Sequence, residues 1–373
     1  MSINIISFLR SSRNLFLKRL FHFSAWWIYQ KNRFHQTQLK DSLYTSEYKK
    51  YINCLKKGNN VKQQYRQLKE FLSSSFKLIS DNLIQTDDVF VPIVFVVVRN
   101  ELERMKIFLE HYRKLGIKNF IILDNGSDDG TVEYLEKQEG TKIYQILEKF
   151  QTQKKESWIE KMLAMEGVNR WCLVVDSDEL LDFIGSENHL INQIIQKASE
   201  AGYKRIWGFM LDMYSKDPLF TQNNFNLSMI ENLRFFDKNS YELFCVKGKN
   251  KNDLIFGGPR ARAFNIKPAL SKQAIFFYEE NVLYSNCHFL FPTVKWGEIP
   301  CWFVLRHYKF SPADKMEYER RILEKGFYNN SQEYRIIMDK VKRQNDGMYY
   351  EDSVEYKDSN SLKCLPFITE ISW

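Results

Sequence analysis

The sequence has few cysteines, and none in an arrangement that binds zinc or builds a disulfide framework. Its six cysteines lie far apart in 373 residues, with no C-x-x-C pair and no histidine cluster nearby. This excludes a structural zinc site and a disulfide-stapled scaffold, and it is typical of a protein from a reducing compartment.

Long apolar runs and repeats are also missing. No apolar stretch reaches the roughly 18 residues that span a bilayer, and no apolar segment with a small-residue cleavage site indicates a secretory signal. Neither an internal repeat nor a low-complexity tract is present. The 44% hydrophobic and 15% aromatic content nevertheless predicts a substantial core, in one large domain with extensions or in two domains.

Negative charge is scarce only at the N-terminus. Residues 1–70 carry 14 Lys and Arg against three Asp and Glu, a net charge of +11, whereas the remaining residues carry a net charge of −3. Aromatic and aliphatic residues recur there at helical spacing, so residues 1–35 predict a basic amphipathic helix that contacts an anionic membrane surface. Docking on the protein's own core or on a partner subunit stays open. No nucleic-acid reading motif accompanies the charge, so nucleic acid is not expected as a partner.

Alternating strands and helices fill the middle of the chain. The β-branched run 91–98 predicts a strand, 102–115 an amphipathic helix, and 120–123 a second strand. A right-handed crossover makes these two strands parallel neighbours. Further strands are predicted at 142–147 and 171–175, which together indicate an α/β fold with a mostly parallel sheet flanked by helices.

Two carboxylates follow a buried apolar strand. The run 171–175 leads directly into Asp176-Ser177-Asp178-Glu179. Strand residues two apart share a side, and the carboxyl ends of strands are where open α/β sheets bind ligands. Adjacent carboxylates repel each other unless a cation neutralises them, and Mn²⁺ or Mg²⁺ is usually bound by such carboxylates together with substrate phosphates. D-x-D is common by chance, so the pair alone favours the alternative, a loop of solvated acids. Glu179 orients this site or caps the next turn.

A second acidic turn follows an earlier strand. Residues 120–123 lead into Asp124-Asn125-Gly126-Ser127-Asp128-Asp129-Gly130-Thr131. Asp124 ends its strand as Asp176 ends a later one, so both carboxylates are expected to face one crevice. The glycines alone are equally well explained by a plain strand–turn–helix connector.

Two arginines near a Gly-Gly-Pro turn are candidates for binding an anion. Arg260 and Arg262 alternate with small residues and suit a phosphate or an anionic acceptor; surface ion pairs are the alternative. His307 follows the aromatic strand 302–305 and is a candidate metal ligand, with His288 as its competitor.

Taken together, these strings resemble the family 2 glycosyltransferases. The resemblance rests on 98–101, on the helix end 111–116, and on the two acidic strings 124–131 and 176–179. It covers residues 91–183, and it extends to the downstream segments 257–262 and 305–310. Residues 1–88 and 315–373 fall outside it.

The resemblance implies a GT-A fold, Rossmann-like, with a metal-dependent site for a nucleoside diphosphate sugar. By this resemblance Asp124 would bind the nucleobase, and Arg99, Asn100 and Glu101 would lie beside the nucleoside. Asp176 would approach the ribose and the metal, Asp178 would ligate the metal, and His307 would be its third ligand. A transferase that inverts configuration also needs a base for the acceptor hydroxyl, and Asp212, at the end of the strand 205–214, is the predicted one.

We therefore predict three regions: a basic helical extension at 1–88, a GT-A domain at 89–312 and a helical arm at 313–373. The predicted function is Mn²⁺- or Mg²⁺-dependent hexosyl transfer from a donor, UDP-linked by expectation, to a polysaccharide or lipid-linked glycan. The expected location is cytoplasmic or at the inner membrane face. Two alternatives stay open, a D-x-D phosphohydrolase and a non-catalytic partner protein with a degenerate transferase fold.

Overall fold

The computed structural model describes residues 49–51, 61–221, 229–246, 252–295, 297–344 and 346–373. Its centre is a nine-stranded sheet in the order β1-β4-β3-β2-β5-β11-β7-β14-β6. The strands are β1 (Lys77–Asp81), β2 (Ile93–Val98), β3 (Phe120–Asp124), β4 (Thr141–Gln145), β5 (Arg170–Val174), β6 (Glu179–Asp182), β7 (Arg205–Asp212), β11 (Ser271–Tyr278) and β14 (Cys301–His307). Strands β2 to β5, β7 and β14 run in one direction, and β1, β6 and β11 run in the other. The predicted α/β class with a mostly parallel sheet is therefore confirmed.

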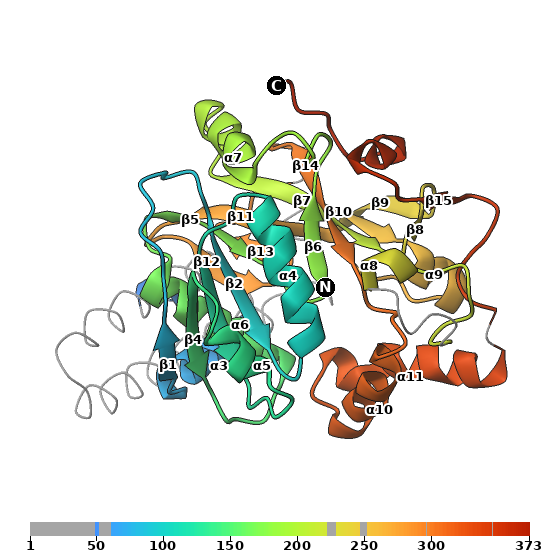
Figure 1. The fold of residues 1–373 in the computed structure, drawn as a ribbon, viewed down its shortest axis with the longest axis horizontal. Coiled ribbons are helices and arrows are strands. Elements are labelled where there is room, and N and C mark those ends of the chain that lie inside the picture. The colour runs from blue at the N-terminus through green and yellow to red at the C-terminus, as the bar shows by residue number, and fades with distance from the viewer. Residues whose placement is uncertain (1–48, 52–60, 222–228, 247–251, 296, 345) are drawn as a thin grey trace, which may run out of the picture.

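Helices cover both faces of this sheet (Figure 1). On one face α4 (Leu102–Lys114) and α7 (Ile191–Glu200) pack on side chains such as Val94 and Val96. On the other, α6 (Thr152–Glu166) packs on Phe95 and its neighbours. Successive β2 side chains point to opposite faces, so a strand buried on both sides has to be apolar throughout, as the run 93–98 is.

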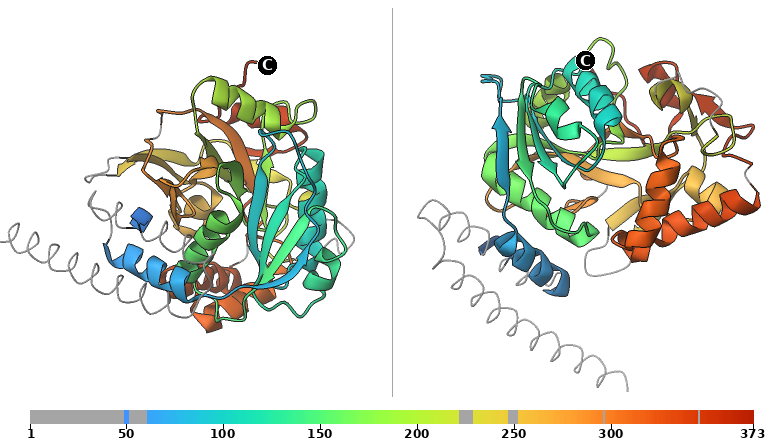
Figure 2. Two further views of the ribbon diagram at one scale, coloured as in Figure 1. Left: turned by 90° about the vertical axis from the view of Figure 1, so that its left-hand side faces the viewer. Right: turned by 60° about the horizontal axis from the view of Figure 1, so that its bottom comes forward.

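Smaller elements lie around the sheet. They are α5 (Thr131–Leu135), α8 (Met229–Asn232), β8 (Phe235–Asp237), β9 (Tyr241–Val246), β10 (Asn252–Gly257), α9 (Pro259–Phe264), β12 (Leu283–Asn286), β13 (Phe289–Phe291), α10 (Asp314–Glu324), α11 (Tyr328–Arg343), β15 (Ser353–Glu355) and the 3₁₀ helix η1 (Ser359–Cys364). Helices α10 and α11 pack against each other, and α11 also contacts α9 (Figure 2). This brings the C-terminal region next to the carboxyl ends of the central strands.

The two outer regions differ from their predicted boundaries. Helix α3 (Val61–Ser73) packs on α6, but residues 77–81 form edge strand β1, antiparallel to β4, so the sheet begins before residue 89. In the C-terminal region, β15 pairs with β8, so that region is not wholly helical. The basic segment 1–35 lies outside the described residues. Within the described ranges, no helix combines the length and apolarity that crossing a membrane requires.

The start of α4 shows what the acidic turn 124–131 does structurally. Asn100 has a left-handed backbone (φ 56°) and lies outside the helix. The first amides are instead bound by the turn: the Asp129 carboxylate accepts from Leu102 N, and Thr131 Oγ1 accepts from Glu101 N. These contacts cap the helix in place of a side chain at its own start. They also hold the end of β2 beside the end of β3.

Candidate functional site

A cavity of about 280 Å³ opens at the carboxyl ends of β2, β5 and β14. The central strands contribute Val97 and Val98 from β2, Asp176 and Asp178 from the loop after β5, and His307 from the end of β14. Helix α6 forms one wall and the α10–α11 pair forms another. The ligand site predicted from the strand ends therefore exists as a cavity.

Six of the predicted site residues line this cavity and four do not. Those that line it are Arg99, Glu101, Asp176, Asp178, Arg260 and His307. Those outside its lining are Asn100, Asp124, Asp212 and Arg262. The two strand-end carboxylates of the 176–179 string and the later histidine thus meet in one place, although well over 100 residues of chain separate them.

Asp176 is held at the cavity wall by an ion pair with a lysine and by a hydrogen bond of its backbone N–H. Its carboxylate forms an ion pair with Lys155 of α6, and its backbone N–H donates to Glu179 Oε2 at 2.9 Å. Glu179 is buried and also binds Lys272. Burial raises the pKa of Asp176, but Lys155 and Lys272 more than offset this and leave the pKa below its usual value. Glu179 therefore braces the loop instead of facing substrate.

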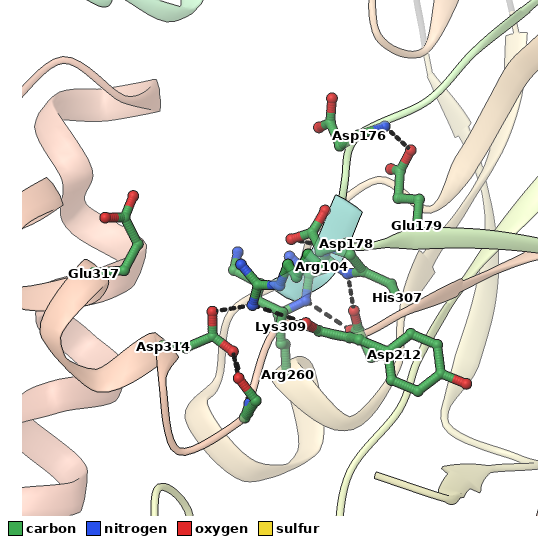
Figure 3. A network of polar contacts seen from close by, with 12 residues as sticks. Arg104, Asp176, Asp178, Glu179, Asp212, Arg260, His307, Lys309, Asp314 and Glu317 are labelled. Atoms are coloured by element: carbon green, nitrogen blue, oxygen red, sulfur yellow. Dashed lines mark hydrogen bonds and ion pairs between the residues drawn. The ribbon is translucent and has the colours of Figure 1, made fainter. Parts of the chain in front are cut away.

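Asp178 begins a buried chain of charges (Figure 3). Its Oδ2 lies 3.5 Å from His307 Nε2, and His307 Nδ1 lies 2.7 Å from Asp212 Oδ1. Arg260 Nε donates to Asp212 Oδ2 at 2.7 Å. Burial lowers the pKa of His307, but the two carboxylates raise it to about 9. Burial raises the pKa of Asp178, yet His307 and Arg104 hold it well below its usual value. In the free protein His307 is therefore protonated and Asp178 ionised at neutral pH.

Among the described residues, no group of three or more His, Cys, Asp or Glu side chains is arranged to hold a metal ion, although single donors of the right type line the cavity. Asp176 and Asp178 supply hard carboxylate oxygens, and the imidazole of His307 has one nitrogen on Asp212 and the other toward Asp178. A metal-binding histidine characteristically has its second nitrogen held by a carboxylate in this way. Binding a cation here requires His307 to release its proton, because only neutral imidazole is a ligand.

Asp212 is not placed to contact an acceptor. It is 1% exposed, and its two oxygens are occupied by His307 and Arg260. Burial raises its pKa, but Arg260 and His307 lower it below the usual value, so the carboxylate is a poor proton acceptor. This placement argues against the predicted role as catalytic base and makes Asp212 a residue that positions His307.

Asp124 is likewise buried, with no exposed surface, and serves its own turn. Its oxygens accept from the backbone N–H groups of Gly126 and Ser127 and from the side chain of Gln145. The next residue, Asn125, lines the cavity instead. Its Nδ2 donates to the carbonyls of Ile146 and Glu148, while its buried Oδ1 has no hydrogen-bond partner. The side chain with an unused hydrogen-bonding atom at the cavity is therefore Asn125, one residue after the predicted one.

The two predicted arginines separate. They lie on α9, where residues two apart point to different sides. Arg260 lines the cavity, and its buried Nη2 has no partner. Arg262 instead donates to both oxygens of Asp237. It therefore forms an ion pair, which was the alternative to anion binding.

Charged side chains on α10 and α11 also line the cavity, and no sequence pattern predicts them. Glu317, Arg320, Arg321 and Glu333 all line the cavity. Arg320 and Arg321 both bind Glu317, and Arg260 and Lys309 share Glu333. Glu317 projects from α10, apart from the Asp178 cluster, in Figure 3. Charges at these spacings look like an ordinary solvated helix face, so only the packing of α10 and α11 shows their role.

We predict that Asp124→Ala lowers the free energy of unfolding by about 2–4 kcal/mol, because it leaves buried donors of the turn without an acceptor. Urea unfolding measures the loss. Asp128→Ala, which removes an exposed acid from the same turn, serves as the control and is expected to cost less than about 1 kcal/mol. Equal effects of the two substitutions would contradict the structural role assigned to Asp124.

Comparison with known proteins adds little. No family model matches the sequence, and no curated protein matches it. Among solved structures, an apo UDP-glucose pyrophosphorylase is similar over 74% of this chain and 95% of that chain, at 10% sequence identity and a TM-score of 0.23. A similarity at this level carries no argument about function, so the function has to be argued from the site.

Proposed function

We propose that this protein is a metal-dependent glycosyltransferase that uses a nucleoside diphosphate sugar. The observation that supports it most directly is the meeting of Asp176, Asp178 and His307 in one cavity at the strand ends. Removing a sugar from a diphosphate leaves negative charge on the leaving group, and a site for this reaction needs positive charge fixed where water is excluded.

Asp178, His307 and Asp176 are the residues we assign to the cation, Mn²⁺ or Mg²⁺. When bound, the ion would neutralise charge on the leaving diphosphate. In the described part of the chain, no group of three or more His, Cys, Asp or Glu side chains is arranged to hold a metal. The cation would therefore have to be held by one or two of these side chains together with substrate phosphates, as Mg²⁺ usually is.

Two unpartnered polar atoms support a nucleotide as the donor's carrier. Asn125 Oδ1 is a buried acceptor at the cavity, which suits the N–H of a uracil ring. Arg260 Nη2 is a buried donor at the same cavity, which suits a phosphate oxygen. Buried polar atoms without partners are rare in proteins, so a ligand that satisfies both is a physical expectation of this site.

The acceptor is proposed from the charge of the N-terminal segment and from the family resemblance. We propose a polysaccharide or lipid-linked glycan, made at a membrane surface that the basic residues 1–35 would contact. The support is the charge of that segment and the family resemblance of residues 91–183.

The test is a panel of nucleotide sugars, each offered with Mn²⁺, with Mg²⁺ and with EDTA, followed by calorimetry and by nucleoside diphosphate release. We expect a UDP-sugar to bind and to be hydrolysed slowly only when a divalent ion is present. Asn125→Ala should weaken UDP binding about tenfold, the loss of one hydrogen bond. Because it also removes the donor to the Ile146 and Glu148 carbonyls, its free energy of unfolding is measured alongside, and binding is compared under conditions where the variant is folded. Failure of every nucleotide sugar to bind, or phosphate release from simple monoesters instead, would overturn the assignment.

A further inference from the structure

One carboxylate at the cavity differs from all the others. Seven acidic side chains line it, and six of them form ion pairs with cationic side chains. The pairs are Glu101–Arg104, Asp176–Lys155, Asp178–His307, Glu179–Lys272, Glu317–Arg321 and Glu333–Arg260. The seventh, Glu156, forms no ion pair with any residue that the structure describes.

Neutral groups surround Glu156. It lies on α6, and Gln67 of α3 donates Nε2 to its Oε2 at 3.3 Å while also donating to the Ser285 carbonyl at 2.6 Å. Gln63 of α3 supplies a second amide hydrogen bond. These amides fix the position of the carboxylate, but they bring no positive charge to it.

The titratable groups that face Glu156 come from three elements. They are Lys155 on its own helix, Tyr284 of β12, and His288 in the turn between β12 and β13. Lys155 is engaged by Asp176, and His288 Nδ1 lies 2.9 Å from the Ser271 carbonyl. Burial dominates over these neighbours and raises the pKa of Glu156 to about 7.

We propose, resting on the glycosyltransferase function above, that Glu156 is the catalytic base of this site. Its carboxylate takes the proton of the acceptor hydroxyl as that oxygen bonds to the sugar's anomeric carbon. The bond from this carbon to the diphosphate oxygen breaks, and its electron pair leaves with the diphosphate. With water in place of the acceptor, the same step is donor hydrolysis.

The absence of a paired cation is what qualifies Glu156. An acid held by arginine or lysine has to give up part of an ion pair to accept a proton at the working pH. Burial raises the pKa of Glu101 in spite of its ion pair with Arg104, so Glu101 is the acid to test beside Glu156. A general base works best when its pKa lies near that pH. Glu156 meets both conditions and faces the same cavity as Asp178, whereas Asp212 meets neither.

The experiment measures UDP-sugar hydrolysis with Mn²⁺ from pH 5 to 9 for the wild type, Glu156→Gln and Glu101→Gln. We expect wild-type kcat to rise with an apparent pKa near 7. Glu156→Gln should lower kcat at pH 8 roughly 10²–10³-fold, abolish this rise and leave the donor KM within about threefold. Glu101→Gln, which removes an ion-paired acid of the same cavity, should keep the rise whatever its effect on the rate.

Each result has a defined meaning. If the wild type binds and hydrolyses the donor, and Glu156→Gln retains the wild-type pH profile, Glu156 is not the base while the proposed function stands. If Glu101→Gln alone loses the rise, the base is Glu101. If the wild type neither binds nor hydrolyses any nucleotide sugar, the proposed function fails, and the role of Glu156 fails with it.

A readout without activity tests the titration itself. A carboxylate whose pKa is raised in the folded protein costs stability as the pH rises from the unfolded value through the folded one. The melting temperature of Glu156→Gln should therefore exceed that of the wild type at pH 8.5 and match it at pH 5. A difference that does not change with pH would show that Glu156 does not titrate in this range and would overturn its assignment.

Discussion

Asp178→Asn is expected to lower metal-dependent sugar transfer or donor hydrolysis by at least about 10³-fold while the protein stays folded. The asparagine keeps the size of the side chain but loses the charge that holds a cation. Asp178 is ionised in the free protein and lies beside His307 in the cavity, so its removal takes away the main negative group at the proposed metal position. A factor of 10³ corresponds to about 4 kcal/mol of lost transition-state stabilisation.

The assay compares kcat/KM over a range of Mn²⁺ concentrations. Asp128→Asn, an exposed acid on the 124–131 turn, serves as the control and should act like the wild type. A weakened metal site that recovers at high Mn²⁺ would still agree with Asp178 as a ligand. Retention of more than a tenth of the activity at low Mn²⁺ would remove Asp178 from the metal site.

Much of the fold follows from local patterns. The run 93–98 is β-branched and apolar, so it forms a strand buried on both faces, and the helix at 102–114 begins and ends within a residue of its prediction. Edge strand β1 could not be predicted in this way. Its sequence, Lys77–Asp81, is half-polar because the strand is largely exposed, and only its pairing with β4 makes it a strand.

The candidate site could be predicted only in part from sequence patterns. Sequence alone placed Asp176 and Asp178 at the cavity, because strand ends of a mostly parallel sheet converge there. It placed Asp124 there too, because Asp124 ends its strand, and the family resemblance assigned it to the nucleobase. Whether Asp124 or Asn125 is available to a ligand depends on which side chain already accepts hydrogen bonds from the N–H groups of the turn. Asp124 Oδ2 accepts from Gly126 N at 3.0 Å. The sequence does not show whether a side chain is used by local hydrogen bonds or stays available to a ligand.

Arg260 and Arg262 do not share one site, for a related reason. Alternation with small residues suggests that Arg260 and Arg262 share one side, which holds for a strand. Pro259 instead begins the short helix α9, so the two side chains diverge to Asp212 and to Asp237. Likewise, Glu333 of α11 binds Arg260 and Lys309, which lie 73 and 24 residues earlier in the chain, so no local spacing relates them.

Asp212→Asn is expected to lower the free energy of unfolding by about 3–5 kcal/mol near pH 7, because it leaves the buried Arg260 and the protonated His307 without their shared counter-charge. The loss should also depend on pH. His307 has a raised pKa of about 9 in the folded protein, so the stability it contributes is complete below its ordinary value of 6.5 and is lost as the pH rises through 9. With Asp212 neutral, the pKa of His307 falls and much of this slope disappears.

Urea unfolding of the wild type and of Asp212→Asn at pH 6, 7.5 and 9.5 measures both effects. The wild type should lose stability between pH 7.5 and 9.5, and the gap between the two proteins should narrow over the same interval. Asp237→Asn is the control: it breaks the pair of a buried carboxylate with the partly exposed Arg262, which stays charged throughout, so its cost should not follow the titration of His307. A gap that stays constant for Asp212→Asn would mean that Asp212 does not hold the proton on His307. Either His307 is then neutral in the folded protein, or Asp178, the larger of the two influences on its pKa, holds the proton alone; loss of wild-type stability between pH 7.5 and 9.5 identifies the second case.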